Sequence, residues 1–170
     1  MLQWYQAMKD DLLDKTLEVL GRLNDEAVDY VVIGGVALNL HGLVRATEDL
    51  DVFVRPDADN IAALRRALQR VWNDPEIDQI TAEDLCGDYP VVRYGPPDDS
   101  LPLDILTRLG EVARYEDLEH ELIDFEGVAI RVATPETLHW LKAGTVRPQD
   151  QADAAALRSA FDIDPRQAKR

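Results

Sequence analysis

The chain has 170 residues, of which 46% are apolar and 30% charged, and this composition is typical of a globular protein with one domain. Its formal net charge of −15 excludes a protein that binds nucleic acid chiefly by neutralising phosphates, because that needs clustered Lys and Arg. The single cysteine, Cys86, excludes an internal disulfide framework. The sequence has no signal peptide pattern and no apolar run of membrane-spanning length, so we expect a cytoplasmic protein without membrane contact.

The acidity is concentrated in the middle of the chain. Residues 76–126 carry 15 acids and 3 bases, whereas residues 1–75 and 127–170 are closer to balance. The two flanking regions can therefore hold a site for an anion. The acidic region suits a basic partner.

Hydrophobic periodicity predicts an α/β chain with a helical C-terminal end. Apolar residues at helical spacing indicate amphipathic helices, and short β-branched runs indicate strands. Thr134-Pro135 places a cap residue before a first-turn proline, and Glu126-Gly127 indicates a hairpin. We expect one domain over 1–170, with an N-terminal helix over 1–24, an α/β core over 28–132 and C-terminal helices over 134–161. Within it, the expected strands are 30–33, 50–54, 77–80, 89–94, 101–106, 121–125 and 128–132, and the expected further helices are 36–41, about 57–71, 134–144 and 148–161.

The sequence Asp49-Leu50-Asp51 at the second strand is the most informative motif. Residues two apart on a strand point to the same face, so both carboxylates project together. Two adjacent carboxylates repel each other unless a cation lies between them, and Mg²⁺ or Mn²⁺ is the usual one. The alternative interpretation of this pair alone is a solvated strand end.

Two further features point to phosphate chemistry. Asp104 lies in the apolar run 102–106, where an ionised group costs several kcal/mol unless it is paired or binds metal. Three carboxylates on strands are what two-metal phosphoryl transfer needs. Gly34-Gly35 ends a buried strand and opens a helix, so the backbone can approach a phosphate there. The alternatives are a half-buried strand with Asp104 on its wet face, and a simple tight turn.

The order of these motifs resembles the nucleotidyltransferase superfamily with the polymerase-β-like minimal fold, and in particular its AbiEii/AbiGii-type toxin branch. The resemblance covers most of residues 28–158 and implies a mixed β-sheet flanked by helices. The motifs that carry it are Gly34-Gly35-x-Ala37-Leu38, Arg45-x-Thr47, Asp49-x-Asp51, the later strand residue Asp104, Thr134-Pro135-Glu136-Thr137-Leu138, Lys142 and Arg147-Pro148-x-Asp150-x-x-Asp153.

The resemblance implies an enzyme that moves a nucleoside monophosphate from an NTP to an RNA (tRNA-like) or protein acceptor. It also implies a toxin that acts with an antitoxin protein. Asp49, Asp51 and Asp104 would bind Mg²⁺ or Mn²⁺, and Asp104 is also a candidate base for the acceptor hydroxyl. Gly34 and Gly35 would seat the β- and γ-phosphates.

The cationic residues complete the expected site. Lys142 lies in an otherwise apolar helix and is a candidate catalytic partner of the phosphates, although a snorkelling surface lysine is the alternative. Arg45 is expected to contact phosphate or to pair with Asp49. Thr47 is expected to shape the loop, and Arg147 is a further nucleotide-binding candidate.

Asp150 and Asp153 lie three residues apart on one helix face. They are candidates for orienting Lys142 or Arg147 or for assisting the acceptor, and a surface ion network is the alternative. Val36 stands where many members of the superfamily have Ser or Thr. It favours the alternative function of a catalytically inactive nucleotide- or partner-binding module. The three histidines and Cys86 are expected to have no catalytic role.

Overall fold

A computed structural model of the chain describes residues 10–111, 113–164 and 166. It is a mixed α/β fold, as the sequence predicts, with a six-stranded sheet in the order β3-β4-β2-β1-β8-β7. The strands are β1 (Tyr30–Ile33), β2 (Leu50–Val54), β3 (Val91–Tyr94), β4 (Leu103–Leu106), β7 (His120–Phe125) and β8 (Val128–Ala133), with β5 (Arg108–Leu109) and β6 (Ala113–Arg114) as a separate pair. The helices are α2 (Asp10–Asp25), α3 (Gly34–Leu40), α4 (Ala58–Trp72), α5 (Ala82–Cys86), α6 (Pro135–Ala143) and α7 (Pro148–Phe161), with 3₁₀ turns η1 (Pro75–Gln79) and η2 (Tyr115–Asp117).

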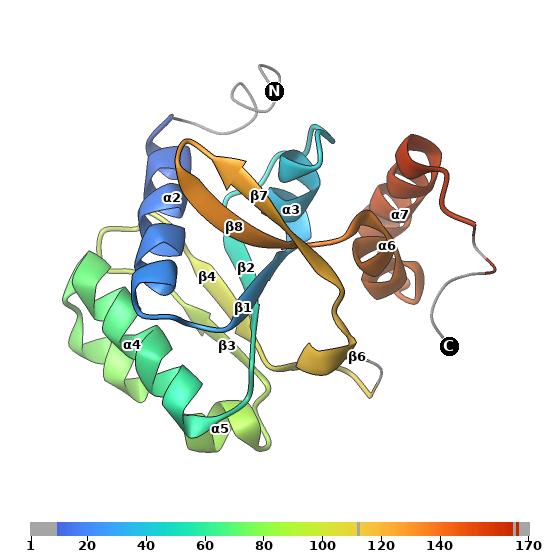
Figure 1. Cartoon of the computed structure of the whole chain (residues 1–170). Coiled ribbons are helices and arrows are strands. Elements are labelled where there is room, and N and C mark those ends of the chain that lie inside the picture. The colour runs from blue at the N-terminus through green and yellow to red at the C-terminus, as the bar shows by residue number, and fades with distance from the viewer. Residues whose placement is uncertain (1–9, 112, 165, 167–170) are drawn as a thin grey trace.

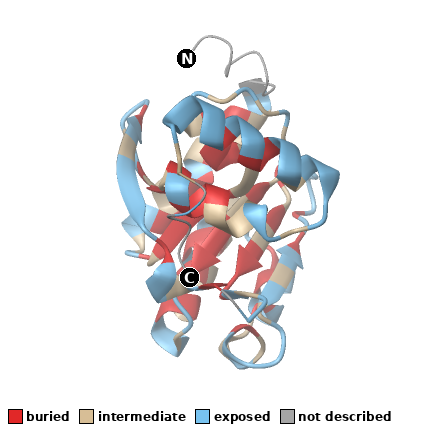
Figure 2. Cartoon of the chain, turned by 90° about the vertical axis from the view of Figure 1, so that its right-hand side faces the viewer, coloured by how far each residue is buried: buried red, intermediate tan, exposed pale blue. Residues whose placement is uncertain are grey.

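The central strands are covered on both sides by helices. Strand β1 runs antiparallel to β2 and parallel to β8, while β2 is parallel to β4, so the middle of the sheet is mixed. Helices α2 and α4 pack against each other on one side, and α3 with α6 and α7 lies on the other (Figure 1). All four residues of β1 are buried, as expected for a strand covered on both faces. Figure 2 shows that the buried residues follow the strands and the inner sides of the helices.

Local capping explains where several helices begin. Asp57 caps α4 by accepting a hydrogen bond from the backbone N–H of Asn60, and Thr134 caps α6 by accepting one from Thr137. Prolines occupy the first turns of α6 and α7, where the missing N–H is not needed. These signals explain why the predicted extents of the C-terminal helices agree with the structure to within a residue.

The expected strand over 77–80 is wrong. The chain forms the 3₁₀ turn η1 there, because Asp74 caps the turn at Glu76 N–H and Pro75 occupies its first position. Ile77 and Ile80 are three residues apart and both are buried. Helix α5 and the β5–β6 pair were not predicted. The expected N-terminal helix is present from Asp10, and its first nine residues lie outside the described part. No helix of the described residues is long and apolar enough to span a membrane.

Candidate active site

One row across the sheet carries the central charged groups of the site. Asp51 of β2 pairs in register with Asp104 of the parallel strand β4 and with Ile33 of β1. Asp104 pairs in turn with Arg93 of the antiparallel edge strand β3. Residues opposite each other on neighbouring strands project from the same face. The register therefore places the side chains of Arg93, Asp104 and Asp51 side by side, next to the end of β1.

The two glycines after β1 allow the backbone to approach this row. Gly34 has φ +70°, and a Cβ at this position would overlap the carboxylate of Asp51. A Cβ on Gly35 would lie 2.8 Å from the Cβ of Thr47. A side chain at either position would therefore displace a residue of the site. This close approach is the structural reason for glycine at both positions.

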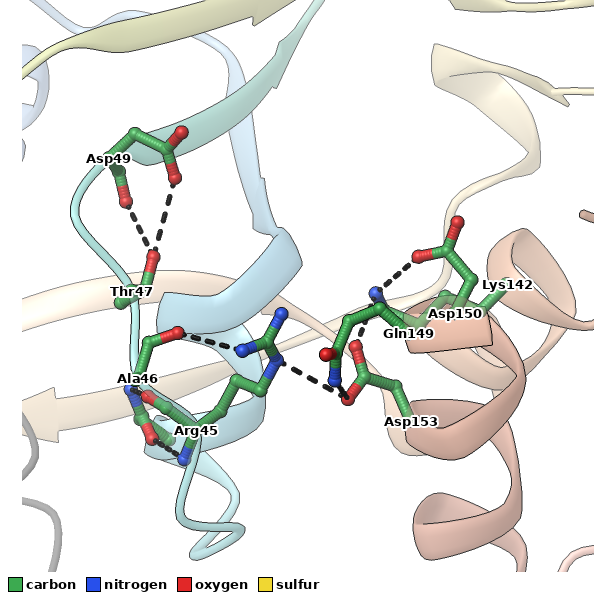
Figure 3. A network of polar contacts seen from close by, with 9 residues as sticks. Arg45, Ala46, Thr47, Asp49, Lys142, Gln149, Asp150 and Asp153 are labelled. Carbon is green, nitrogen blue, oxygen red and sulfur yellow. Dashed lines mark hydrogen bonds and ion pairs between the residues drawn. The ribbon is translucent and has the colours of Figure 1, made fainter. Parts of the chain in front are cut away.

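Asp49, the first carboxylate of the Asp-x-Asp motif, lies one residue before β2, whereas Asp51 is on the strand itself. The hydroxyl of Thr47 donates to the backbone carbonyl of Asp49 at 3.1 Å and to its Oδ1 at 3.3 Å (Figure 3). These contacts fix the loop that carries Asp49. Thr47 thus ties its own loop to the residue that precedes β2.

Helices α6 and α7 present a compact ion cluster on the other side of the site. The Nζ of Lys142 lies 3.1 Å from Oδ1 of Asp150 and 2.9 Å from Oδ2 of Asp153 (Figure 3). The Lys142 and Asp153 side chains are only 14% and 8% exposed. Thr145 donates to the other Asp150 oxygen at 2.9 Å. Asp150 and Asp153 thus hold the Lys142 ammonium between them.

Arg45 joins the same cluster from the loop before β2. Its Nε lies 3.4 Å from Oδ1 of Asp153, and its Nη1 donates to the carbonyl of Ala46 at 3.0 Å. The expected pairing of Arg45 with Asp49 is therefore not the contact that the structure contains. Asp153 instead links the loop before β2 to Lys142, because it receives both cations on one carboxylate.

These elements surround a polar cavity of about 530 Å³. It adjoins a more apolar cavity of about 500 Å³, to which β1, β4 and α6 contribute aliphatic side chains. Six residues line both cavities, among them Asp51, Asp104 and Lys142. The polar cavity is lined by every site residue predicted from the sequence: Gly34, Gly35, Arg45, Thr47, Asp49, Asp51, Asp104, Lys142, Arg147, Asp150 and Asp153.

The electrostatics single out Asp51. Burial raises the pKa of Asp51 to about 7, and the neighbouring charges of Asp49 and Asp104 add to this rise, against the opposing effect of Lys142 and Arg93. At Asp150, burial alone would raise the pKa, but the hydrogen bonds from Thr145 and Lys142 outweigh it and lower the pKa. Negative charge is therefore unfavourable at Asp51 and well compensated at Asp150.

The donor set of Asp49, Asp51 and Asp104 fits a divalent cation in its chemistry. Carboxylate oxygens are hard ligands of the kind that Mg²⁺ prefers, and a cation would relieve the repulsion that raises the pKa of Asp51. As the side chains stand, the described residues contain no group of three or more His, Cys, Asp or Glu arranged to hold a metal ion. Arg93 instead contacts Asp104 and Asp49 at 2.9 and 3.5 Å.

Arg93 is the residue of this site that the sequence analysis missed. Its place follows from the pairing register of β3 with β4, which no local motif specifies. One signal was available, because Arg93 is one of only three bases in the acidic region 76–126. The histidines and Cys86 line neither of the two cavities.

Comparison with known families agrees with this geometry. The sequence model of the family described as "Nucleotidyl transferase AbiEii toxin, Type IV TA system" matches residues 18–167. The chain belongs to this AbiEii family. Membership confirms the family and the nucleotidyltransferase class that the motifs predicted.

Solved structures share the fold of this AbiEii-family chain. An antigenic nucleotidyltransferase-like protein from Paracoccidioides brasiliensis is 17% identical with a TM-score of 0.53, over 89% of this chain and 77% of that one. ANT(2″)-Ia in complex with adenylyl-2″-tobramycin is 12% identical with a TM-score of 0.53, over 88% of this chain and 90% of that one. No curated protein matches the chain. At these identities the likeness concerns the fold.

Proposed function

We propose that this AbiEii-family chain transfers a nucleoside monophosphate from an NTP to a hydroxyl group of an RNA or protein acceptor. The acceptor oxygen forms a bond to the α-phosphorus, the bond from that phosphorus to the bridging oxygen of the β-phosphate breaks, and pyrophosphate leaves. The observation that supports this most is the convergence of Gly34, Asp51, Asp104 and Lys142, from four separate elements, on one polar cavity.

Asp49, Asp51 and Asp104 are the residues proposed to hold Mg²⁺ or Mn²⁺. Bound there, the cations would supply charge stabilisation at the α-phosphoryl group and activate the attacking hydroxyl. Asp104 is proposed to accept the hydroxyl proton. Asp51 lies beside Asp104 in the row and directly against Gly34, so its carboxylate is placed to meet both the cations and the phosphates.

The phosphates are proposed to lie along Gly34, Gly35 and the cations of the polar cavity. Lys142 uses two of its three N–H donors on Asp150 and Asp153, which leaves one donor for a phosphate oxygen. Arg147 lines both cavities and is exposed, and the described residues give it no ion pair. Its side chain is therefore available to a phosphate without breaking an ion pair among the described residues.

The cavity that continues beside Asp51 and Asp104 gives room for a less charged part of a substrate. Its aliphatic lining comes from Ile33, Leu106, Leu138 and Leu141 among others. A nucleoside or an acceptor side chain is predominantly uncharged compared with a triphosphate. The triphosphate thus has a place in the polar cavity, and the less charged nucleoside or acceptor group has one in the more apolar cavity.

The role proposed in the cell is that of a toxin with a cognate antitoxin, in line with the family description. An antitoxin that binds directly would meet the acidic region 76–126 with a basic surface. An RNA acceptor would instead dock on residues outside this region. Charge reversal within 76–126 that leaves a purified toxin–antitoxin complex intact would contradict the direct contact.

The test of the proposed reaction uses the purified chain, Mg²⁺, each of the four NTPs labelled at the α-phosphate, and RNA and protein fractions of a cell extract. We expect one fraction to become labelled, and Asp49→Asn and Asp51→Asn to abolish the labelling. Arg158→Ala, on an exposed part of α7 outside both cavities, is the control that keeps it. Labelling that survives both carboxylate substitutions would contradict the proposed site.

A second function is favoured by Val36. This residue of α3 is 1% exposed and packs into the hydrophobic core of the protein, so the position after the glycines offers no hydroxyl to a phosphate. The corresponding alternative is a nucleotide- or partner-binding module without transfer. Mg²⁺-dependent NTP binding without labelling of any RNA or protein fraction would identify it.

A further inference from the structure

Arg93 bridges two of the three proposed metal ligands. Its Nη1 lies 3.1 and 2.9 Å from the two oxygens of Asp104 and 3.5 Å from Oδ2 of Asp49. The guanidinium therefore supplies positive charge to the same oxygens that a divalent cation would use. No other described cation forms an ion pair with either of these carboxylates.

The remaining cations of the site differ from Arg93 in their partners. Lys142 and Arg45 are bound to Asp153, which is 8% exposed and is not among the proposed metal ligands. Their contacts can persist when a cation binds. The contacts of Arg93 cannot all persist, because one carboxylate oxygen does not accept a close guanidinium and a metal bond with the same lone pair.

Arg93 is also placed so that it can leave. It lies on the edge strand β3, and its side chain is 58% exposed. It lines a separate cavity of about 510 Å³ together with the carboxylates Glu76 and Asp84. A guanidinium that leaves Asp104 can therefore turn to the solvent or toward this acid-lined cavity. An exposed ion pair is weak, so its loss costs little compared with the attraction of a divalent ion for two carboxylates.

We propose that Arg93 is a displaceable counter-ion of the metal site: it neutralises Asp104 and Asp49 in the free protein and is released from them when a divalent cation binds. This rests on the proposed function, since it takes both carboxylates as metal ligands. Arg93 then acts as a competitor that sets the affinity of the site. The charge that Arg93 brings to this competition stays constant over the ordinary pH range, because an arginine side chain stays protonated.

The first test is the affinity of the full chain for Mn²⁺ without nucleotide, measured by electron paramagnetic resonance of free Mn²⁺. We expect Arg93→Ala to lower the Kd for Mn²⁺ about 2- to 5-fold, which corresponds to the loss of a weak exposed ion pair. Arg108→Ala is the matched control, because Arg108 is also exposed and in the acidic region but lines neither cavity of the site. It changes the net charge equally, and its Kd should stay that of the unsubstituted chain.

An unchanged or raised Kd in Arg93→Ala overturns the proposal, because Arg93 would then be inert or would position the ligands. The proposed function fails in a different way. If the three carboxylates are not a metal site, Mn²⁺ binds neither to the unsubstituted chain nor to Arg93→Ala, and this result contradicts both the metal site and the counter-ion role. Absence of label transfer by the unsubstituted chain, together with tighter Mn²⁺ binding by Arg93→Ala, would leave the counter-ion role intact and contradict only the reaction.

The second test follows the guanidinium itself. The Nε–H signal of Arg93 in an ¹⁵N nuclear magnetic resonance spectrum is assigned by its disappearance in Arg93→Lys. Addition of Mg²⁺ should shift this signal, and the same addition to Asp51→Asn should shift it less. A signal that does not respond to Mg²⁺ in a chain that binds Mg²⁺ overturns the displacement.

Discussion

Gly34 lies directly against the carboxylate of Asp51, so closely that a methyl group at position 34 would overlap Asp51 Oδ2. The contact joins the end of β1 to the neighbouring strand β2 at the centre of the sheet. A backbone with φ +70° and no side chain is what makes it sterically acceptable. The site is therefore built into the pairing of the two central strands.

Gly34→Ala should destabilise the chain more than the positive φ alone explains. The left-handed backbone costs a non-glycine residue roughly 1–2 kcal/mol, and the overlap with Asp51 adds to this. Gly42→Ala is the control, because Gly42 has φ +88° and an added Cβ there would have no neighbouring atom within 4 Å. Urea unfolding should show a larger loss for Gly34→Ala. Equal losses would mean that the Asp51 carboxylate moves aside without cost.

The stability of the metal-free chain should fall as the pH rises from about 4 to about 7. In this range the folded chain holds a proton on Asp51, whose pKa is raised to about 7 by burial, while the unfolded chain has already lost it. The free energy of unfolding should fall by about 1–3 kcal/mol over this range through this group. Asp51→Asn should remove this part of the slope in urea titrations with chelator present. Parallel curves for the two chains would contradict the raised pKa.

Lys142→Met should destabilise the chain by about 2–4 kcal/mol, because it leaves the carboxylates of Asp150 and Asp153 without their shared counter-ion. Arg45 compensates only part of this at Asp153. Combining Lys142→Met with Asp150→Asn and Asp153→Asn should recover much of the loss. Urea unfolding of the three single variants and of the combined variant measures the coupling, and additive losses would mean that the cluster is not energetically connected.

Arg147→Ala should weaken NTP binding about 5- to 20-fold and leave the free energy of unfolding unchanged. The side chain is exposed at the start of α7 and lines both cavities. Arg158→Ala removes the same charge from the same helix outside the cavities. Isothermal titration with a non-hydrolysable NTP distinguishes the two variants. Equal NTP affinities of the two variants would show that Arg147 does not contact the bound NTP.

The sequence predicts well those parts of the fold that depend on local patterns. The run at 30–33, the capping residue Thr134 and the first-turn Pro148 correspond to elements with nearly the expected bounds. The prediction of a strand over 77–80 was wrong, although Asp74-Pro75 is the same kind of helix-start signal as Thr134-Pro135. Its two isoleucines also suit a strand, and only the cap shows that they share one side of a turn.

The contents of the candidate site were predicted, but part of its arrangement depends on pairing between distant strands. Asp49, Asp51 and Lys142 could be named from motifs. The position of Arg93 depends on β3 pairing with β4 so that Arg93 faces Asp104, and a shift by one residue would turn it to the other face. The link from Arg45 to Asp153 depends in the same way on how α7 packs against the loop before β2.

The central claim is transfer of a nucleoside monophosphate at this site, and the position of the label in the NTP tests it most directly. The chain is incubated with Mg²⁺, acceptor fraction and NTP labelled either at the α- or at the γ-phosphate. The account predicts that the acceptor takes up the α-label alone, that the γ-label is released in pyrophosphate, and that Asp51→Asn stops both. Uptake of the γ-label by the acceptor, or release of inorganic phosphate in place of pyrophosphate, would contradict it.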